Sequence, residues 1–77
     1  MTKTKRQPTE LDKYIGDAIA LQRKIKNKSR KQLGEKVGIC YQQIQHYETG
    51  KHQITINKLV DISKALAVRF AEFLPKE

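Results

Sequence analysis

The sequence predicts an all-α fold, a compact bundle of five helices. Apolar residues recur at helical spacing, with Leu33 and Val37 four residues apart and Ile44 and Tyr47 three residues apart. A chain of 77 residues buries only roughly 60% of its unfolded surface, and a helical bundle is an economical way to build so small a core. We therefore expect one small domain, residues 9–77.

The chain before this domain, residues 1–8, is polar and basic and ends at Pro8. We expect it to form a flexible arm. Thr9 and Asp12 give a capping signal for a first helix over about Glu10 to Lys26. One face of this helix is expected to be shared by Leu11, Ile15, Ala18, Ile19 and Gln22.

Two short helices are predicted next, over about residues 30–37 and 41–48. Ser29 can cap the first of them, and Gln32 is placed to complete a capping box. Gly38 falls where a left-handed backbone can end this helix without a steric penalty. Gly34 has no side chain, which lets a second backbone cross closely there.

The predicted fourth helix covers about residues 56–67 and is capped by Thr55. The broad apolar face of a central core helix is expected from Ile56, Leu59, Val60, Ile62, Ala65 and Leu66. A short fifth helix is predicted over about residues 70–74, stopping at Pro75.

Charge favours a polyanionic partner. The chain has 16 Lys and Arg against 8 Asp and Glu, a formal charge of +8 and a pI of about 9.8. No apolar run approaches the roughly 18 residues needed to span a bilayer, and the first residues lack the apolar core of a signal peptide. We expect a cytoplasmic protein with no membrane partner, and the single Cys40 agrees with a reducing compartment.

Catalytic and metal sites are not expected. Cys40 and His46 lie six residues apart, so they project in different directions from a helix, and no third ligand follows at a useful spacing. A glycine-rich phosphate loop and a supported Ser/His/Asp arrangement are also absent from the sequence. We therefore predict no enzyme activity, no metal and no cofactor.

The stretch from Arg30 to Thr49 resembles the lambda-repressor-like (XRE, Cro/CI-type) helix-turn-helix family. The residues that carry the resemblance are a small residue, a glycine, an aliphatic residue, and then a glutamate and a glycine: Gly34, Gly38, Ile44, Glu48 and Gly50. The resemblance implies a DNA-binding domain of bacterial or phage origin, with its helix-turn-helix at helices two and three.

The resemblance covers about residues 14–74. The segment YQQIQHYETGKHQI is similar to a bacterial subset that reads roughly fQQvQKYErGtNRv. Two positions depart from the family pattern. Cys40 stands where the family has a Ser or Thr cap, and Gly34 replaces a commoner alanine, which lowers helix propensity by up to about 1 kcal/mol.

One face of the helix over residues 41–48 is a candidate for reading bases. With Ile44 and Tyr47 buried, a rotation of about 100° per residue directs outward Gln42, Gln45, His46 and Thr49. A glutamine side chain offers one acceptor and one donor, which suits the N7 and N6 edge of adenine. The alternative is a polar face that is simply solvated.

The resemblance places base contacts at Tyr41, Gln42 and His46, and Gln45 flanks them. We expect these four residues to contact bases, with Gln42 the strongest candidate. The ring of Tyr41 suits a thymine methyl group and its hydroxyl suits a phosphate, but it is equally open to a partly buried packing role. His46 is equally open to being an ordinary surface residue.

Phosphate contacts are expected around this helix, because phosphate neutralisation supplies affinity without sequence information. The candidates are Ser29, Arg30, Gln43, Thr49, Lys51 and His52. Arg30 resembles the family position at a helix N-terminus, where amides already face phosphate, whereas capping alone explains Ser29. Lys3, Lys5 and Arg6 of the arm can also reach DNA, but a solubilising tail is the preferred interpretation.

Arg23 and Glu48 are implied by the resemblance to form an ion pair that orients the recognition helix. A partly buried pair adds little net stability, so its value would be orientation. The alternatives for Arg23 are direct phosphate contact and free solvation.

The function predicted is sequence-specific binding of double-stranded DNA by a transcriptional repressor. It would act as a homodimer on a palindromic operator, with residues 41–48 in the major groove. The candidates for the dimer surface are Phe70, Phe73 and Leu74, together with residues of the loop before the fourth helix. These three side chains can instead close the monomer core.

Two alternatives remain open from the sequence. One keeps the fold but docks its basic surface on an acidic protein, such as a toxin or another regulator. The chain would then be the antitoxin of a toxin–antitoxin pair or a bridging factor. The other is general coating of nucleic acid, which would show steep salt dependence without a preferred sequence.

Overall fold

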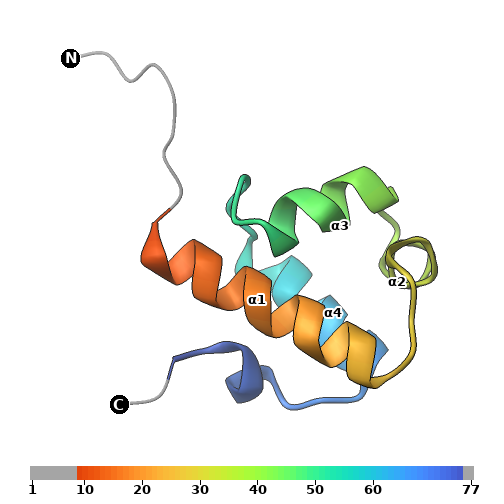
Figure 1. The fold of residues 1–77 in the computed structure, drawn as a ribbon. Coiled ribbons are helices and arrows are strands. Elements are labelled where there is room, and N and C mark those ends of the chain that lie inside the picture. Colours follow the sequence, from red (N-terminus) through yellow and green to blue (C-terminus); the bar gives the residue numbers. More distant parts are fainter. Residues whose placement is uncertain (1–8, 76–77) are drawn as a thin grey trace.

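The computed structural model describes residues 9–75, and over that range the fold is all-α. It has four α-helices, named α1 (Glu10–Ile25), α2 (Arg30–Val37), α3 (Tyr41–Glu48) and α4 (Ile56–Leu66). A short 3-10 helix, η1 (Phe70–Phe73), follows them (Figure 1). The predicted arm, residues 1–8, lies outside the described residues.

The prediction of five helices is wrong, because residues 70–74 form a single 3-10 turn and not a fifth α-helix. The segment lies between Arg69, whose backbone is extended, and Pro75. A segment of this length is too short to offset the cost of nucleating an α-helix. Tighter i to i+3 hydrogen bonds therefore form, from Glu72 N–H to the Arg69 carbonyl and from Leu74 N–H to the Ala71 carbonyl.

The predicted N-terminal caps are confirmed. The Thr9 hydroxyl accepts from the Asp12 amide at 3.1 Å, and the Asp12 carboxylate accepts from the Thr9 amide at 3.1 Å. Ser29 and Gln32 form the same capping box at 3.0 Å and 2.8 Å. Thr55 accepts from the Lys58 amide. These contacts explain why α1, α2 and α4 begin where the sequence places them.

The C-terminal ends differ slightly from the prediction. Helix α1 ends at Ile25 and not at Lys26, and Asn27 then turns the backbone with a φ of 58°. Helix α4 ends at Leu66 because Ala67 is left-handed, also with a φ of 58°. Gly38 ends α2 with a φ of 78°, as predicted.

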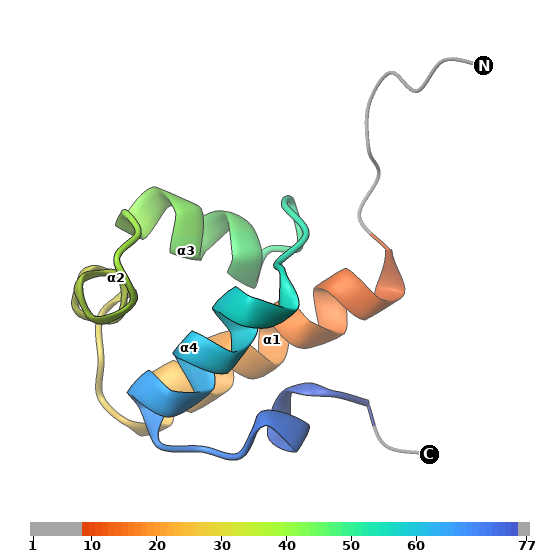
Figure 2. The same ribbon diagram turned by 180° about the vertical axis from the view of Figure 1, so that it is seen from behind.

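Helix α1 lies across the middle of the molecule. Figures 1 and 2 show α3 on one side of α1 and η1 on the other, with α4 packed along α1. Helix α2 is seen nearly end-on in both views while α3 lies across them, so the two helices cross. No helix within residues 9–75 has the length and apolar content to cross a bilayer.

Seven side chains form the buried core. They come from every helix and from η1: Ile19, Leu33, Ile44, Leu59, Ile62, Leu66 and Phe73. The predicted burial of two residues is wrong, because Leu11 is 50% exposed and Ile56 is 66% exposed. Both lie in the first turn of a helix, where the chain enters from the surface.

Phe73 is fully buried and completes the monomer core. Its predicted place on a dimer surface is therefore wrong. Phe70 and Leu74 are half-buried and pack against the same core.

Candidate nucleic-acid interface

The turn between α2 and α3 is fixed by two glycines. The Gly34 carbonyl accepts hydrogen bonds from the Gly38 amide at 2.8 Å and the Ile39 amide at 3.0 Å. A Cβ atom on Gly34 would collide with the carbonyl oxygen of Ile39. The close crossing expected at Gly34 is therefore present, and it sets the direction in which α3 leaves the turn.

Helix α3 is anchored by a buried side and presents a polar side. Ile44 is 0% exposed and Tyr47 is half-buried against the core. Three uncharged side chains, Tyr41, Gln42 and Gln45, are exposed. We call these three residues the outer face of α3, and Figure 1 shows α3 at the edge of the molecule, so this face is open to a partner.

The C-terminal end of α3 rests directly on the backbone of α1. A Cβ atom on Gly16 would collide with the carbonyl oxygens of Tyr47 and Glu48, lying 2.6 Å from that of Glu48. The sequence reasoning did not identify Gly16. The signal that could have identified Gly16 is its place inside a helical segment, because a glycine there commonly marks close packing.

Two arginines donate hydrogen bonds to the Glu48 carboxylate where α3 meets α1. Arg23 donates from Nε to Oε2 at 2.6 Å and from Nη2 to Oε1 at 3.1 Å, and Arg30 donates from Nε to Oε1 at 3.0 Å. The Glu48 side chain is 2% exposed and that of Arg23 is 10% exposed. Arg23 also donates from Nη1 to the Lys28 carbonyl at 2.9 Å. One carboxylate thus joins α1, α2 and α3.

The pairing of Arg30 with Glu48 was not foreseen in the sequence. Arg30 opens α2 and its side chain is 39% exposed. One edge of its guanidinium is held by Glu48, while the group still reaches the surface. This arrangement fixes the position of a cation at the last residue of α3.

His46 does not point fully outward as the helical rotation predicted. Its ring is half-buried, packs 4.4 Å from the His52 ring, and its Nδ1 atom is buried without a hydrogen-bond partner. Desolvation lowers the pKa of His46, and the charges of His52 and Lys51 lower it further. The lowered pKa favours the neutral imidazole, and the base contact of His46 remains a prediction for a half-buried ring.

Gln43 and His52 contact each other. Gln43 Oε1 lies 3.2 Å from His52 Nδ1, which links α3 to the loop that follows it. The amides of Lys51 and His52 both donate to the His46 carbonyl, at 2.9 Å and 3.3 Å. These bonds place two exposed basic residues close to the end of α3.

Two other predicted phosphate contacts already have local partners. The Thr49 hydroxyl donates to the carbonyls of Gln45 and His46, at 3.1 Å and 3.3 Å. The Ser29 hydroxyl accepts the capping bond from Gln32. Both side chains are in exposed residues, so their local bonds position them at the surface.

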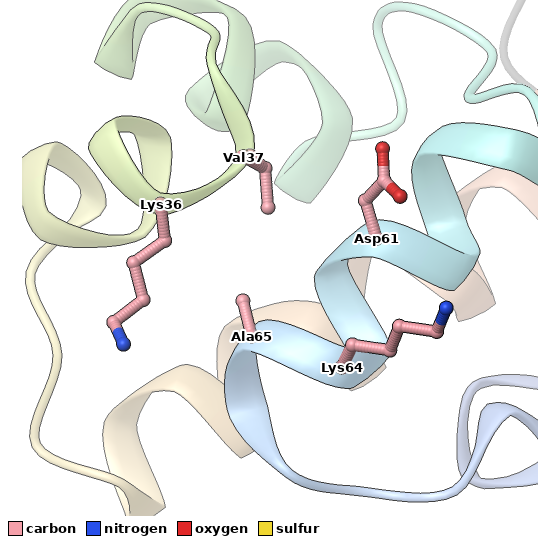
Figure 3. Close-up of a pocket in the computed structure, with 5 residues that line it drawn as sticks. All are labelled: Lys36, Val37, Asp61, Lys64 and Ala65. Carbon is pink, nitrogen blue, oxygen red and sulfur yellow. The ribbon is translucent and has the colours of Figure 1, made fainter.

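A recess of about 520 Å³ lies between α2 and α4, away from the outer face of α3. Figure 3 shows Lys36 and Val37 from α2, and Asp61, Lys64 and Ala65 from α4. None of the residues predicted to contact DNA lines it. Within residues 9–75, no group of three or more His, Cys, Asp or Glu side chains is arranged to hold a metal ion.

Sequence comparison finds a family match over most of the chain. The helix-turn-helix family model matches residues 19–73. The chain is 39% identical over 70 residues to the uncharacterized HTH-type transcriptional regulator y4wC of Sinorhizobium fredii (strain NBRC 101917 / NGR234), covering 91% of this chain and 49% of that protein. The chain spans about half the length of such relatives.

Solved structures share the fold. The clp gene regulator ClgR from C. glutamicum superposes with a TM-score of 0.81 at 20% identity, covering 84% of both chains. The P22 c2 repressor protein, in complex with a synthetic operator, superposes with a TM-score of 0.74 at 25% identity, covering 82% of this chain and 96% of that one.

Proposed function

Because this chain belongs to the XRE-type helix-turn-helix family of DNA-binding transcription regulators, we propose that it is a sequence-specific repressor. It binds a palindromic operator as a homodimer and places α3 in the major groove. Its relatives are bacterial transcriptional regulators, and the site of action is accordingly the bacterial cytoplasm.

The observation that carries this proposal is the outer face of α3. Ile44 is fully buried on the opposite side of the helix, so Gln42 and Gln45 are held outward in a fixed register. The face is uncharged although the chain carries a formal charge of +8. Uncharged amides flanked by cations suit hydrogen bonding to base edges between two phosphate strands.

Basic residues near α3 support phosphate contacts. Arg30 lies at the start of α2, while Lys51 and His52 follow α3. Backbone amides at the N-terminus of α2 add to the attraction for phosphate. These groups position the duplex, and the glutamines read it.

We propose a homodimer because the recognition helix is short. A single eight-residue recognition helix contacts only a few base pairs, and each base pair contributes roughly 1–3 kcal/mol of discrimination. Two copies placed about one helical turn of DNA apart give selectivity and require a palindromic site. The c2 repressor, which is similar in fold, is described in complex with an operator.

Selection of duplexes from a random pool tests the proposal. We expect enriched sequences to contain two inverted half-sites with a fixed spacing. A pool without enrichment would refute sequence-specific binding and would favour general coating of nucleic acid. If the protein retained an acidic protein and retained no DNA, the protein-interaction alternative would be favoured.

Gln42→Ala tests the role of α3 in particular. We expect it to weaken binding to the selected operator by roughly 10-fold or more, the effect of one lost bidentate base contact. Gln22→Ala is the matched control, because it removes the same group from α1, away from the outer face of α3. Equal operator affinity of the two variants would exclude Gln42 from base reading.

A further inference from the structure

Helix α1 carries an apolar strip whose four large side chains are exposed, around a half-buried alanine at its centre. Its members follow a spacing of three and four residues: Leu11, Tyr14, Ala18, Leu21 and Ile25. Four of these side chains are 43–59% exposed. We call these five residues the α1 strip. This spacing is that of the a and d positions of a coiled-coil seam, and a contiguous exposed apolar surface is typical of an interaction site.

The α1 strip faces away from the outer face of α3. At about 100° per residue, its centre lies about 180° around α1 from Gly16. Gly16 is the residue whose backbone meets the carbonyls of Tyr47 and Glu48 on α3. Figures 1 and 2 agree, because α3 lies along one side of α1 only. A partner bound to the strip therefore leaves α3 open.

We propose that the α1 strip pairs with the α1 strip of a second copy of this chain, with the two helices antiparallel. This inference goes beyond the proposed function, because it concerns a surface that does not contact DNA. A two-fold axis between the helices makes the contact the same on both molecules.

Side-chain size is complementary in this antiparallel register. When Ala18 lies opposite Leu21 of the second copy, Tyr14 lies opposite Ile25, and a small residue meets a large one at the centre. A recess of about 360 Å³ is already present here, lined by Tyr14, Asp17, Ala18, Leu21, Gln22 and Glu72. Leu21 of the second copy is the side chain placed to enter it, as a knob enters a hole.

Charge is also complementary. One edge of the strip carries Glu10 and Asp17 in its first half and Lys24 in its second half. Antiparallel pairing brings this edge against the same edge of the second copy and sets Asp17 of each copy near Lys24 of the other. The two helix dipoles also favour the antiparallel arrangement.

The consequence is a connection between DNA-bound molecules. Recognition helices on opposite outer sides of such a pair cannot enter adjacent grooves of one operator, so each serves a separate DNA segment. A single pair of short helices buries less than the roughly 1,200–2,000 Å² of a stable interface. We therefore expect weak association in solution that becomes significant when DNA concentrates the protein.

Sedimentation equilibrium of the full chain over a range of concentrations is the first test. We expect reversible association that Leu21→Glu weakens by at least about tenfold, because a carboxylate would be buried without a partner. Leu21 is 56% exposed, so the variant remains folded, which circular dichroism verifies. A parent protein that shows no association, or a Leu21→Glu protein that associates equally well, would overturn the proposal.

A charge exchange tests the register. Asp17→Lys and Lys24→Asp should each weaken association, and the double variant should restore it, because the opposite charges again meet. Both side chains are exposed, so neither change disturbs the core. Additive losses in the double variant would contradict the antiparallel register.

Disulfide trapping tests the orientation. In a Cys40→Ser background, Ala18→Cys protein mixed with Leu21→Cys protein should form a mixed disulfide faster than either variant forms one alone. Faster formation by each variant alone would indicate parallel helices and would overturn the proposal.

A DNA-bridging measurement separates this inference from the proposed function. Immobilised operator should retain a second, labelled operator in the presence of the parent protein. Leu21→Glu should abolish this retention while binding a single operator with unchanged affinity. Loss of single-operator binding would instead place the α1 strip in DNA recognition and refute the inference, whereas an absence of operator binding by the parent would count against the proposed function alone.

Discussion

Arg23 on α1 holds Glu48 at the end of α3 through two hydrogen bonds, from Nε to Oε2 at 2.6 Å and from Nη2 to Oε1 at 3.1 Å. The pair joins residues 25 positions apart in the chain. Because the carboxylate is almost fully buried, its energetic role differs from that of a surface ion pair, and its removal leaves a buried guanidinium without a charged partner.

Glu48→Gln should therefore destabilise the protein by about 3 kcal/mol, since removing one member of a buried pair costs roughly 3–5 kcal/mol and the amide oxygen still accepts one bond. Urea unfolding measures this change. Arg30→Ala removes only the half-exposed partner and should cost about 1 kcal/mol or less of stability.

If Glu48 orients α3, the operator affinity of Glu48→Gln falls even under conditions where the variant is fully folded. Unchanged affinity under those conditions would refute the orienting role.

Gly16→Ala should destabilise the protein by about 1–3 kcal/mol, because the new Cβ overpacks the contact between α1 and α3. Helix propensity alone predicts the opposite sign, a gain of up to about 1 kcal/mol. Asp17→Ala, at the next and exposed position, is the control in which propensity acts alone. A Gly16→Ala protein with a higher melting temperature than the parent would contradict the close approach.

Cys40→Ser should stabilise the protein by about 0.5–2 kcal/mol, the range for an N-cap side chain. Cys40 occupies the N-cap of α3 but makes no side-chain capping bond, so serine adds a side-chain acceptor for the amides of the first turn. Cys40→Ala removes the thiol without adding this acceptor. Chemical denaturation of both variants distinguishes capping from loss of the thiol, and equal stability of the two would exclude a capping effect.

Lys51→Ala should weaken binding to all duplexes alike and should reduce the slope of log K against log salt by about 0.9, the value for one phosphate contact. Lys51 is exposed in the loop after α3. Gln42→Ala should instead leave this slope unchanged and reduce the preference for the operator. Binding titrations at several salt concentrations separate the two roles, and a normal slope for Lys51→Ala would exclude its phosphate contact.

The pKa of His46 is lowered first by desolvation and then by the positive charges of His52 and Lys51. His52→Ala should therefore raise the pKa of His46, because it removes one charge and uncovers the ring. Acidification should also reduce the free energy of unfolding in the parent, since the unfolded chain binds this proton more readily than the folded one. NMR titration of the imidazole resonances measures the shift, and a pKa of His46 that falls in the variant would contradict this account.

Much of the fold was predictable because its signals are local. Thr9, Ser29 and Thr55 each cap a helix through a residue three positions later, and this distance is visible in the sequence. Gly38 marks a left-handed turn for the same reason. The burial of Ile44 followed from helical spacing and from the family resemblance, which together also predicted the exposed glutamines.

Other features were decided by contacts between distant segments. Gly16 meets α3, Arg30 joins Arg23 on Glu48, and His46 is covered by His52. Residue spacing along one helix does not specify which neighbouring element will cover a side chain, so these contacts were missed.

The sequence by itself determined that four segments become helices, where each begins, and which side of α3 is polar. Tertiary structure decided that the last segment is only a 3-10 turn with Phe73 in the core, that Leu11 and Ile56 remain exposed, and that one carboxylate joins three helices. The physical reason is range, because capping and helical periodicity act over three or four residues, whereas burial and ion pairing depend on where the packed helices finally lie.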